Sequence, residues 1–247
     1  MLYARKSASM GIRALLKEIG VSYELAQTTI DMDRPRPPEQ LAINPNGWVL
    51  VPVWDGGSMY ECSAITVFHC DRHPEAGLAP VLDDTTRAQC LQILVYISNS
   101  VQNAFQLIYY PDRFADTAAN ERNAQRRGNR RLRETWNVVD DQIGVNEWML
   151  GKRFSAVDIY LFMLTTWLKS AKGHPAIDEF PTSNVVPMRL CRGQAFNLST
   201  IPGSRIRSTE HGVHPVRLDV RIRHPRWPVR QGRHCEVRGA RRLTCAS

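Results

Sequence analysis

The stretch INPNGWVLVPVWDGGSMYECSAI, residues 43–65, holds a turn, a short apolar strand, a second turn and the start of a helix. Residues 44–47, Asn-Pro-Asn-Gly, predict the first turn, because proline fixes one backbone angle and Asn and Gly tolerate the left-handed region. Residues 48–54 are apolar and mostly branched or aromatic, which predicts a buried strand with Pro52 at an edge, an end or a bulge. Residues 55–58, Asp-Gly-Gly-Ser, predict a hairpin turn, and Met59–Tyr60 a short returning strand.

A helix is expected to follow this hairpin, opened by the acid Glu61 and the hydroxyl of Ser63. Apolar residues recur at helical spacing from about Cys62, and the helix should end before Pro74. Because the first N–H groups of a helix are unpaired and carry the positive end of its dipole, this start is a natural site for an anion.

The segments before this stretch predict two strands joined by a helix. Apolar residues at helical spacing predict a helix over residues 10–19, with Ser9 as its N-cap and Gly20 after its end. Strands are expected at residues 2–4 and 21–29, and a short helical turn at residues 39–43. Two parallel strands joined by a helix, followed by a hairpin and a helix, form a thioredoxin-like arrangement.

From Thr85 onward the sequence predicts helices alone. Apolar stripes indicate a helix from about residue 90 to 110 and another from 116 to 143. Ser155 followed by Asp158 predicts a capping box at the start of a central, mostly apolar helix. The predicted fold class is therefore α+β, with a thioredoxin-like N-terminal domain at 1–74, a linker at 75–84 and an all-α helical-bundle domain at 85–181.

The motif INPNG…VPVWDGGSMYECSAI, followed by DRHPEAGLAP at residues 71–80, resembles the glutathione-binding half of the glutathione S-transferase superfamily. The resemblance extends over about residues 2–181 and includes the capping box of the helical domain. It implies that Val51 and Pro52 align the cysteinyl backbone of glutathione, and that Glu61 with Cys62 or Ser63 holds its γ-glutamyl end. It further implies a homodimer and a small electrophilic substrate placed between the domains, near the face that carries Tyr109 and Tyr110.

In the resembling family, a Ser, Tyr or Cys after the first strand donates a hydrogen bond to the glutathione sulfur. Ser7 and Ser9 are the candidate catalytic residues by position, and Tyr3, inside the strand, is a weaker one. A hydroxyl donor stabilises the thiolate, which is the nucleophilic form of the thiol. The alternative interpretation is that Ser9 only caps its helix.

The chain departs from the family pattern at three places. Counted from the Asn-Pro-x-Gly turn, the family's proline falls at Leu50, whereas this chain has Pro52. The expected Glu-Ser pair reads Glu61–Cys62, with Ser63 one place later, and a thiol is a weaker donor than a hydroxyl. Arg5–Lys6 replace the Pro-Gly that is common after the first strand.

Three interpretations of the protein follow from these observations. The first is conjugation of the glutathione thiolate, with glutathione as co-substrate, to small electrophiles. The second is a non-catalytic binding protein that keeps the fold and has lost part of the glutathione site. The third is a damaged gene product without the last helix of its domain.

Charge and composition limit the kinds of partner that the chain is expected to bind. Residues 1–181 hold 19 Lys and Arg against 21 Asp and Glu, whereas residues 182–247 hold 13 Arg, no Lys and 3 acids. We interpret this tail as disordered or translated out of frame, with a basic arm for nucleic acid or acidic lipid as the alternative. The arginines between residues 126 and 133 are interpreted as a solvated helix face, so nucleic acid is not an expected partner.

The remaining expectations concern location and metals. No apolar run approaches the ~20 residues of a membrane helix, and the first twenty residues show no signal-peptide pattern, so a cytoplasmic location is predicted. His69 and His73, with Cys70 and Asp71 between them, have no further ligands at metal-site spacing, and no metal is predicted.

Overall fold

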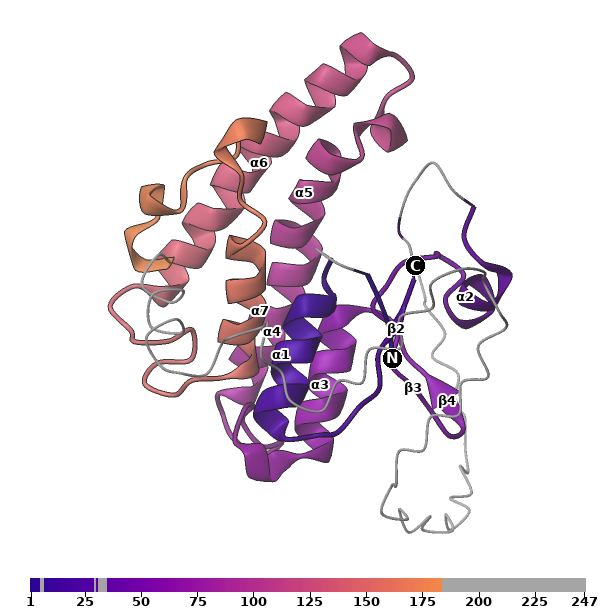
Figure 1. Ribbon diagram of the computed structural model, residues 1–247. Helices are drawn as coiled ribbons and strands as arrows, with labels where there is room; N and C mark the ends of the chain where they lie inside the picture. Colours follow the sequence, from indigo (N-terminus) through magenta and orange to yellow (C-terminus); the bar gives the residue numbers. More distant parts are fainter. Residues whose placement is uncertain (5–6, 29, 31–34, 184–247) are drawn as a thin grey trace, which may run out of the picture.

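The structure of the protein, a computed structural model, describes residues 1–4, 7–28, 30 and 35–183 of the 247-residue chain (Figure 1). β1 runs parallel to β2, with Leu2 opposite Ala26, and β3 runs antiparallel to β4. The parallel pair joined by a helix, then a hairpin and a helix, is the predicted order. The elements of this part are β1 (Leu2–Tyr3), α1 (Ser9–Ile19), β2 (Ala26–Gln27), α2 (Pro38–Ile43), β3 (Val53–Trp54), β4 (Gly57–Ser58) and α3 (Cys62–Arg72).

The strands are shorter than the sequence predicted. Of the described residues 21–28 only Ala26–Gln27 form a strand, and of residues 48–54 only Val53–Trp54 do so, with an isolated bridge at Val51. The returning strand is Gly57–Ser58, so its prediction at Met59–Tyr60 was wrong. Trp54 pairs with Gly57, which leaves Asp55 and Gly56 as a two-residue turn. Gly56 has a φ of 90°, and an Asp-Gly pair closes such a hairpin by itself.

The first strand packs on two sides. Tyr3 belongs to the main core with Ile12 and Leu15 of α1, whereas Leu2 and Ala4 belong to a small second cluster. Successive side chains of a strand point to opposite faces, which accounts for this division. In Figure 1 the strands form a middle layer, with α1 and α3 together on one side of it and α2 on the other.

After α3 the regular elements of the described chain are helices, apart from isolated bridges between residues 148 and 153, and the predicted fold class is confirmed. α4, the π-helical turn η2 and α5 follow one another without a break, and α5 lies along the long α6 (Figure 1). The elements are α4 (Arg87–Tyr96), η2 (Ile97–Val101), α5 (Gln102–Tyr109), α6 (Ala118–Ile143) and α7 (Ala156–Thr165), with the 3₁₀ turns η1 (Pro74–Ala76), η3 (Pro111–Phe114), η4 (Ser170–Lys172) and η5 (Ile177–Glu179).

The predicted capping box opens α7. Ser155 is its N-cap, and the Ser155 N–H and hydroxyl donate to Asp158 Oδ2 at 2.9 and 2.8 Å. Met149 N–H donates to Asp158 Oδ1 at 2.9 Å, which fastens the preceding loop to the same carboxyl. Burial raises the pKa of Asp158 to about 6, even though these donors favour the carboxylate. α7 is therefore anchored at its start by one buried acid.

The core continues from the strand-containing part into the helical part. α1 packs on α7, where Gly11 lies so close to Met163 that a Cβ at residue 11 would be 2.9 Å from the Met163 sulfur. The domain boundaries at residues 74 and 84 stay a prediction. Among the described residues, no helix is both long and apolar enough to cross a membrane.

The predicted tail begins at residue 182, and the interpretation of residues 184–247 lies outside the described residues. Thr182 and Ser183 are described, and both donate hydrogen bonds to the Asp140 carboxylate of α6, at 3.2 and 2.6 Å.

Candidate functional site

The main chain of Val51 is fully used within the fold. Leu2 N–H donates to the Val51 carbonyl at 2.9 Å, and Val51 N–H donates to the Leu2 carbonyl at 3.3 Å. Pro52 is buried beside it, and its carbonyl accepts from Met59 N–H at 3.2 Å. The N–H and the carbonyl of Val51 are therefore both hydrogen-bonded to β1 and are not available to pair with a ligand. Val49, two residues earlier, bonds with no other main-chain group among the described residues.

Leu50 lies between these two valines, where the family's proline was expected, and the Val49–Leu50 peptide bond is cis. The Leu50 N–H hydrogen-bonds to the Cys62 sulfur. The two departures from the family pattern, Leu50 and Cys62, are thus neighbours in the fold.

The two candidate hydroxyls after β1 bond to each other. Ser7 Oγ lies 2.8 Å from the Ala4 carbonyl and 2.7 Å from Ser9 Oγ. A carbonyl only accepts, so the Ser7 proton goes to Ala4, and the Ser9 hydroxyl must donate to Ser7. Ala4 N–H donates to Ser9 Oγ at 3.4 Å. Both hydroxyl protons are committed within the loop.

The predicted cap of α1 needs a correction. Ser9 is the first residue of the helix, and Ala8, which precedes it, has no capping side chain. Ser7 Oγ instead accepts the Ser9 N–H at 3.2 Å, so the hydroxyl that serves the helix start is that of Ser7. The N-cap is Ala8, one residue before the predicted Ser9, and the hydroxyl that bonds to the helix start lies two residues before Ser9.

The start of α3 carries Glu61, Cys62 and Ser63. Glu61 is exposed, with a φ of 73°, a conformation that is sparsely populated by residues other than glycine and recurs at functional sites. Cys62 is 9% exposed, and burial, with the charge of Glu61 adding to it, raises the pKa of its thiol to about 12. Cys62 is thus a neutral thiol at physiological pH. Ser63 Oγ lies 3.3 Å from Ser98 Oγ, which belongs to the helical part.

The helical part adds Tyr160 and Gln102 behind Cys62. The Tyr160 hydroxyl donates to Gln102 Oε1 at 2.6 Å. Burial, with Cys62 and Glu61 also contributing, raises the pKa of Tyr160 well above its ordinary value. The start of α3 is therefore backed by neutral, hydrogen-bonded side chains of α5 and α7.

An aromatic and cationic cluster borders the same region. Trp48 and Tyr110 have ring centroids 5.2 Å apart, and the Arg113 guanidinium lies 4.5 Å from the Trp48 centroid and 5.7 Å from that of Tyr110. Arg36 lies over the Trp48 ring at 5.9 Å. We call Trp48, Tyr110 and Arg113 the Trp48 cluster.

Tyr109 does not share the face of Tyr110. Its hydroxyl donates to the Trp167 carbonyl at 3.0 Å, and its ring packs against Phe105 and His174 in the helical part. The predicted pairing of the two tyrosines on one substrate face was wrong, because adjacent residues at the end of a helix point in different directions.

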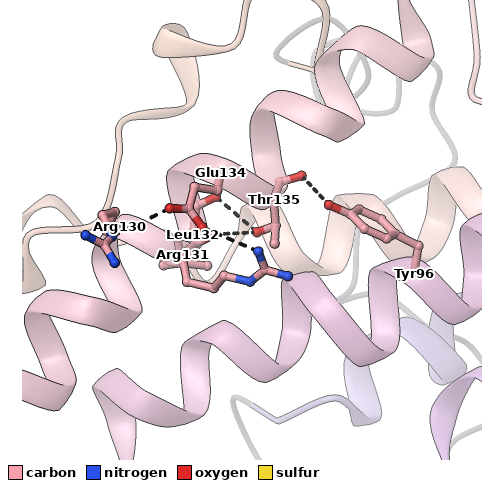
Figure 2. Close-up of polar contacts among 6 residues, drawn as sticks. All are labelled: Tyr96, Arg130, Arg131, Leu132, Glu134 and Thr135. Carbon is pink, nitrogen blue, oxygen red and sulfur yellow. Dashed lines mark hydrogen bonds and ion pairs between the residues drawn. The ribbon is translucent and has the colours of Figure 1, made fainter.

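Three arginines of α6 are paired with acids. Arg130 and Arg131 both contact Glu134, at 3.5 and 3.4 Å, and the Thr135 carbonyl accepts from Tyr96 in the same region (Figure 2). Arg133 makes a two-pronged contact with Glu179, at 2.9 and 3.2 Å. These contacts favour the interpretation of a solvated helix face.

The histidines and acid considered for metal binding lie on or near α3. Asp71 pairs with Arg87 at 2.8 Å, and the His73 ring lies 3.2 Å from Glu75. In the described part of the chain, no group of three or more His, Cys, Asp or Glu side chains is arranged to hold a metal ion.

The structure brings most predicted site residues together. Val51 bonds to β1, β1 leads to the Ser7–Ser9 loop, and Leu50 contacts Cys62 beside Glu61 and Ser63. The pairing of Trp48 with Arg113 was not predicted, because the two residues lie on segments far apart in the chain. A single tryptophan directly after the Asn44–Gly47 turn was the one available signal.

Comparisons with known proteins agree with this geometry. The chain is 24% identical over 176 residues to the glutathione S-transferase GstA of Escherichia coli O157:H7, covering 70% of this chain and 83% of that protein. It is 23% identical over 184 residues to the glutathione S-transferase GST-4.5 of Xanthomonas campestris pv. campestris, covering 72% and 89%. No family model matches the chain.

Solved structures show the same fold. A glutathione transferase homologue from Sulfitobacter, with bound glutathione, superposes with a TM-score of 0.71 at 21% identity, covering 78% of this chain and 92% of that one. BphK, a bacterial glutathione S-transferase in a ternary complex, gives 0.68 at 23% identity, covering 78% and 94%. The resemblance to the glutathione S-transferase superfamily is therefore confirmed, and the chain has its fold.

Proposed function

We propose that the protein is a glutathione transferase that adds the thiolate of bound glutathione to small electrophiles. Glu61 and Ser63, with the Cys62 thiol as a weak donor, hold the γ-glutamyl end at the start of α3. Ser7 or Ser9 donates a hydrogen bond to the sulfur. We also propose that the protein is a cytoplasmic homodimer and that its site holds no metal ion.

The observation that carries the proposal is the continuous contact between the three predicted parts of the site. Leu2 of β1 bonds to Val51, Leu50 bonds to Cys62, and the β1 loop ends in Ser7 and Ser9. The named relatives are glutathione S-transferases, and the Sulfitobacter homologue holds glutathione. This supports the same co-substrate here.

The main chain that pairs with the cysteinyl part of glutathione is assigned to Val49 in this proposal. Val51 was the residue suggested by the sequence resemblance, but its N–H and carbonyl both bond to Leu2. Val49 keeps both groups without a main-chain partner among the described residues. An extended peptide can therefore pair with the Val49 main chain as an added strand pairs with its neighbour.

Thiolate stabilisation requires a change in the serine pair. The Ser7 proton is held by the Ala4 carbonyl and the Ser9 proton by Ser7. A bound thiolate, being charged, is a stronger acceptor than either of these oxygens. We therefore expect one hydroxyl to rotate toward the sulfur when glutathione binds, and Ser7, 6% exposed against 1% for Ser9, is the more accessible.

A second candidate function is a non-catalytic binding protein. The committed serine protons favour it, because neither hydroxyl presents a free donor to the thiolate in this structure. Glutathione binding without turnover would distinguish it from a transferase.

The test is the rate of thioether formation from glutathione and 1-chloro-2,4-dinitrobenzene, measured over a range of pH. The full-length chain should be compared with Ser7→Ala and Ser9→Ala, and with Ser58→Ala in the exposed hairpin as the control. A catalytic hydroxyl predicts a lower rate and a higher apparent pKa of the bound thiol in one variant. Turnover with an unchanged pH profile in both variants would exclude the serines from catalysis.

A further inference from the structure

The Arg113 guanidinium is held by aromatic rings rather than by an acid. It lies 4.5 Å from the Trp48 centroid and 5.7 Å from the Tyr110 centroid, and its side chain is exposed. In the described part of the chain, no carboxylate forms an ion pair with it. Arg113 is thus a cation held in place with its charge uncompensated by a protein acid.

A contact with an aromatic ring does not consume the N–H donors of a guanidinium. Its five N–H donors lie in the plane of the group and form a rigid fork. The in-plane fork matches the two oxygens of a carboxylate and binds them in a bidentate manner. An arginine held in this way has lost part of its side-chain freedom before a ligand arrives.

The positive field in this place comes from two elements. Arg36 also lies over the Trp48 ring, and its Nε and one terminal nitrogen donate to the carbonyls of Gly47 and Ile30, at 3.1 and 2.9 Å. Burial raises the pKa of Tyr110, while Arg113 and Arg36 act in the opposite direction. Both cations are therefore close enough to act on the same ring hydroxyl.

Trp48 ties this cluster to the candidate glutathione site. It directly precedes Val49 and Leu50, and Leu50 contacts Cys62. Tyr110 directly follows α5 and Arg113 lies in η3, so both residues come from the helical part. The cluster therefore lies on the side where the acceptor substrate was predicted.

We propose that Arg113, which lies over the Trp48 and Tyr110 rings, binds a carboxylate of a ligand in the candidate site. This inference rests on the proposed function for its location, and two sources supply such a carboxylate. One is the glycyl end of glutathione, and the other is an aryl acceptor that carries a carboxylate and packs beside the rings.

Calorimetric titrations of the full-length chain separate these sources. The ligands are glutathione, its glycyl monoethyl ester, 4-chloro-3,5-dinitrobenzoate and the methyl ester of that benzoate. The variants are Arg113→Ala, Arg113→Lys, and Arg127→Ala as the control, since Arg127 is exposed on α6 and its removal changes the net charge equally.

For a glycyl source, Arg113→Ala should weaken glutathione about tenfold or more and leave its ester unchanged. For an acceptor source, Arg113→Ala should weaken binding of the benzoate by the same factor and leave binding of its methyl ester unchanged. Arg113→Lys should fall between wild type and Arg113→Ala, because it keeps the charge and loses the planar fork. Thermal unfolding of each variant checks that the fold is intact.

The inference is overturned if Arg113→Ala affects acids and esters equally, or no more than Arg127→Ala does. Failure of the proposed function gives a different result, in which the wild-type chain binds no glutathione. In that case an Arg113-dependent preference for the benzoate over its ester would support the carboxylate site, and no such preference would overturn it.

Discussion

Replacement of Gly128 by alanine tests the close approach of α5 and α6, which positions the end of α5 and the Trp48 cluster. A Cβ at residue 128 would lie 2.7 Å from Ile108 Cγ1, 2.9 Å from Leu107 Cβ and 3.3 Å from the Ala104 carbonyl oxygen. The Ile108 methylene belongs to a buried side chain, and Leu107 Cβ moves only with its helix. The helices must therefore separate.

The expected magnitude combines two opposing effects. Overpacking a well-filled core costs about 1–3 kcal/mol, and contacts on two rigid groups place Gly128→Ala at the upper end. Alanine is favoured over glycine inside a helix by about 1 kcal/mol. We expect a net destabilisation of about 2 kcal/mol, which corresponds to a fall in Tm of about 4–8 °C for a chain of this size.

The assay is thermal unfolding followed by circular dichroism, with Asn137→Ala on the exposed face of α6 as the control. The control changes helix propensity without a packing contact and should be neutral or slightly stabilising. A Gly128→Ala variant as stable as wild type, or more stable, would refute the close approach of the two helices.

Three further predictions concern the polar groups. Ser155→Ala should lower the free energy of unfolding by about 1–3 kcal/mol in urea titrations, since it removes a buried donor to Asp158, whereas an unchanged midpoint would contradict a structural capping box. The raised pKa of Asp158 means that the folded chain holds this proton between about pH 4 and 6 while the unfolded chain releases it. The stability of wild type relative to Asp158→Asn should therefore fall as the pH rises through that window, and an increase would show the opposite shift. Cys62→Ser should tighten glutathione binding by about two- to tenfold in calorimetry, because a hydroxyl donates more strongly than a thiol, and weaker binding would place the ligand elsewhere.

Local signals in the sequence were sufficient for the helices. The capping box joins Ser155 to Asp158 within one turn, and Gly20 ends α1 with a φ of 81°. Both features depend on neighbouring residues alone, which is why the sequence predicted them.

Features that depend on distant partners were misplaced. The extent of the strand after Gly47 is set by the pairing of Val51 with Leu2, which lies on a distant segment. The pairing of Trp48 with Arg113 joins the two parts of the chain and has no local signature. The candidate site was therefore predicted where one motif holds it and missed where the helical part completes it.

Calorimetric titration of the full-length, folded chain with glutathione near neutral pH tests the central claim most directly. We predict saturable binding in the micromolar to low millimolar range, weakened in Glu61→Gln, because the γ-glutamyl ammonium loses its acidic partner. A folded chain that binds no glutathione would contradict the account.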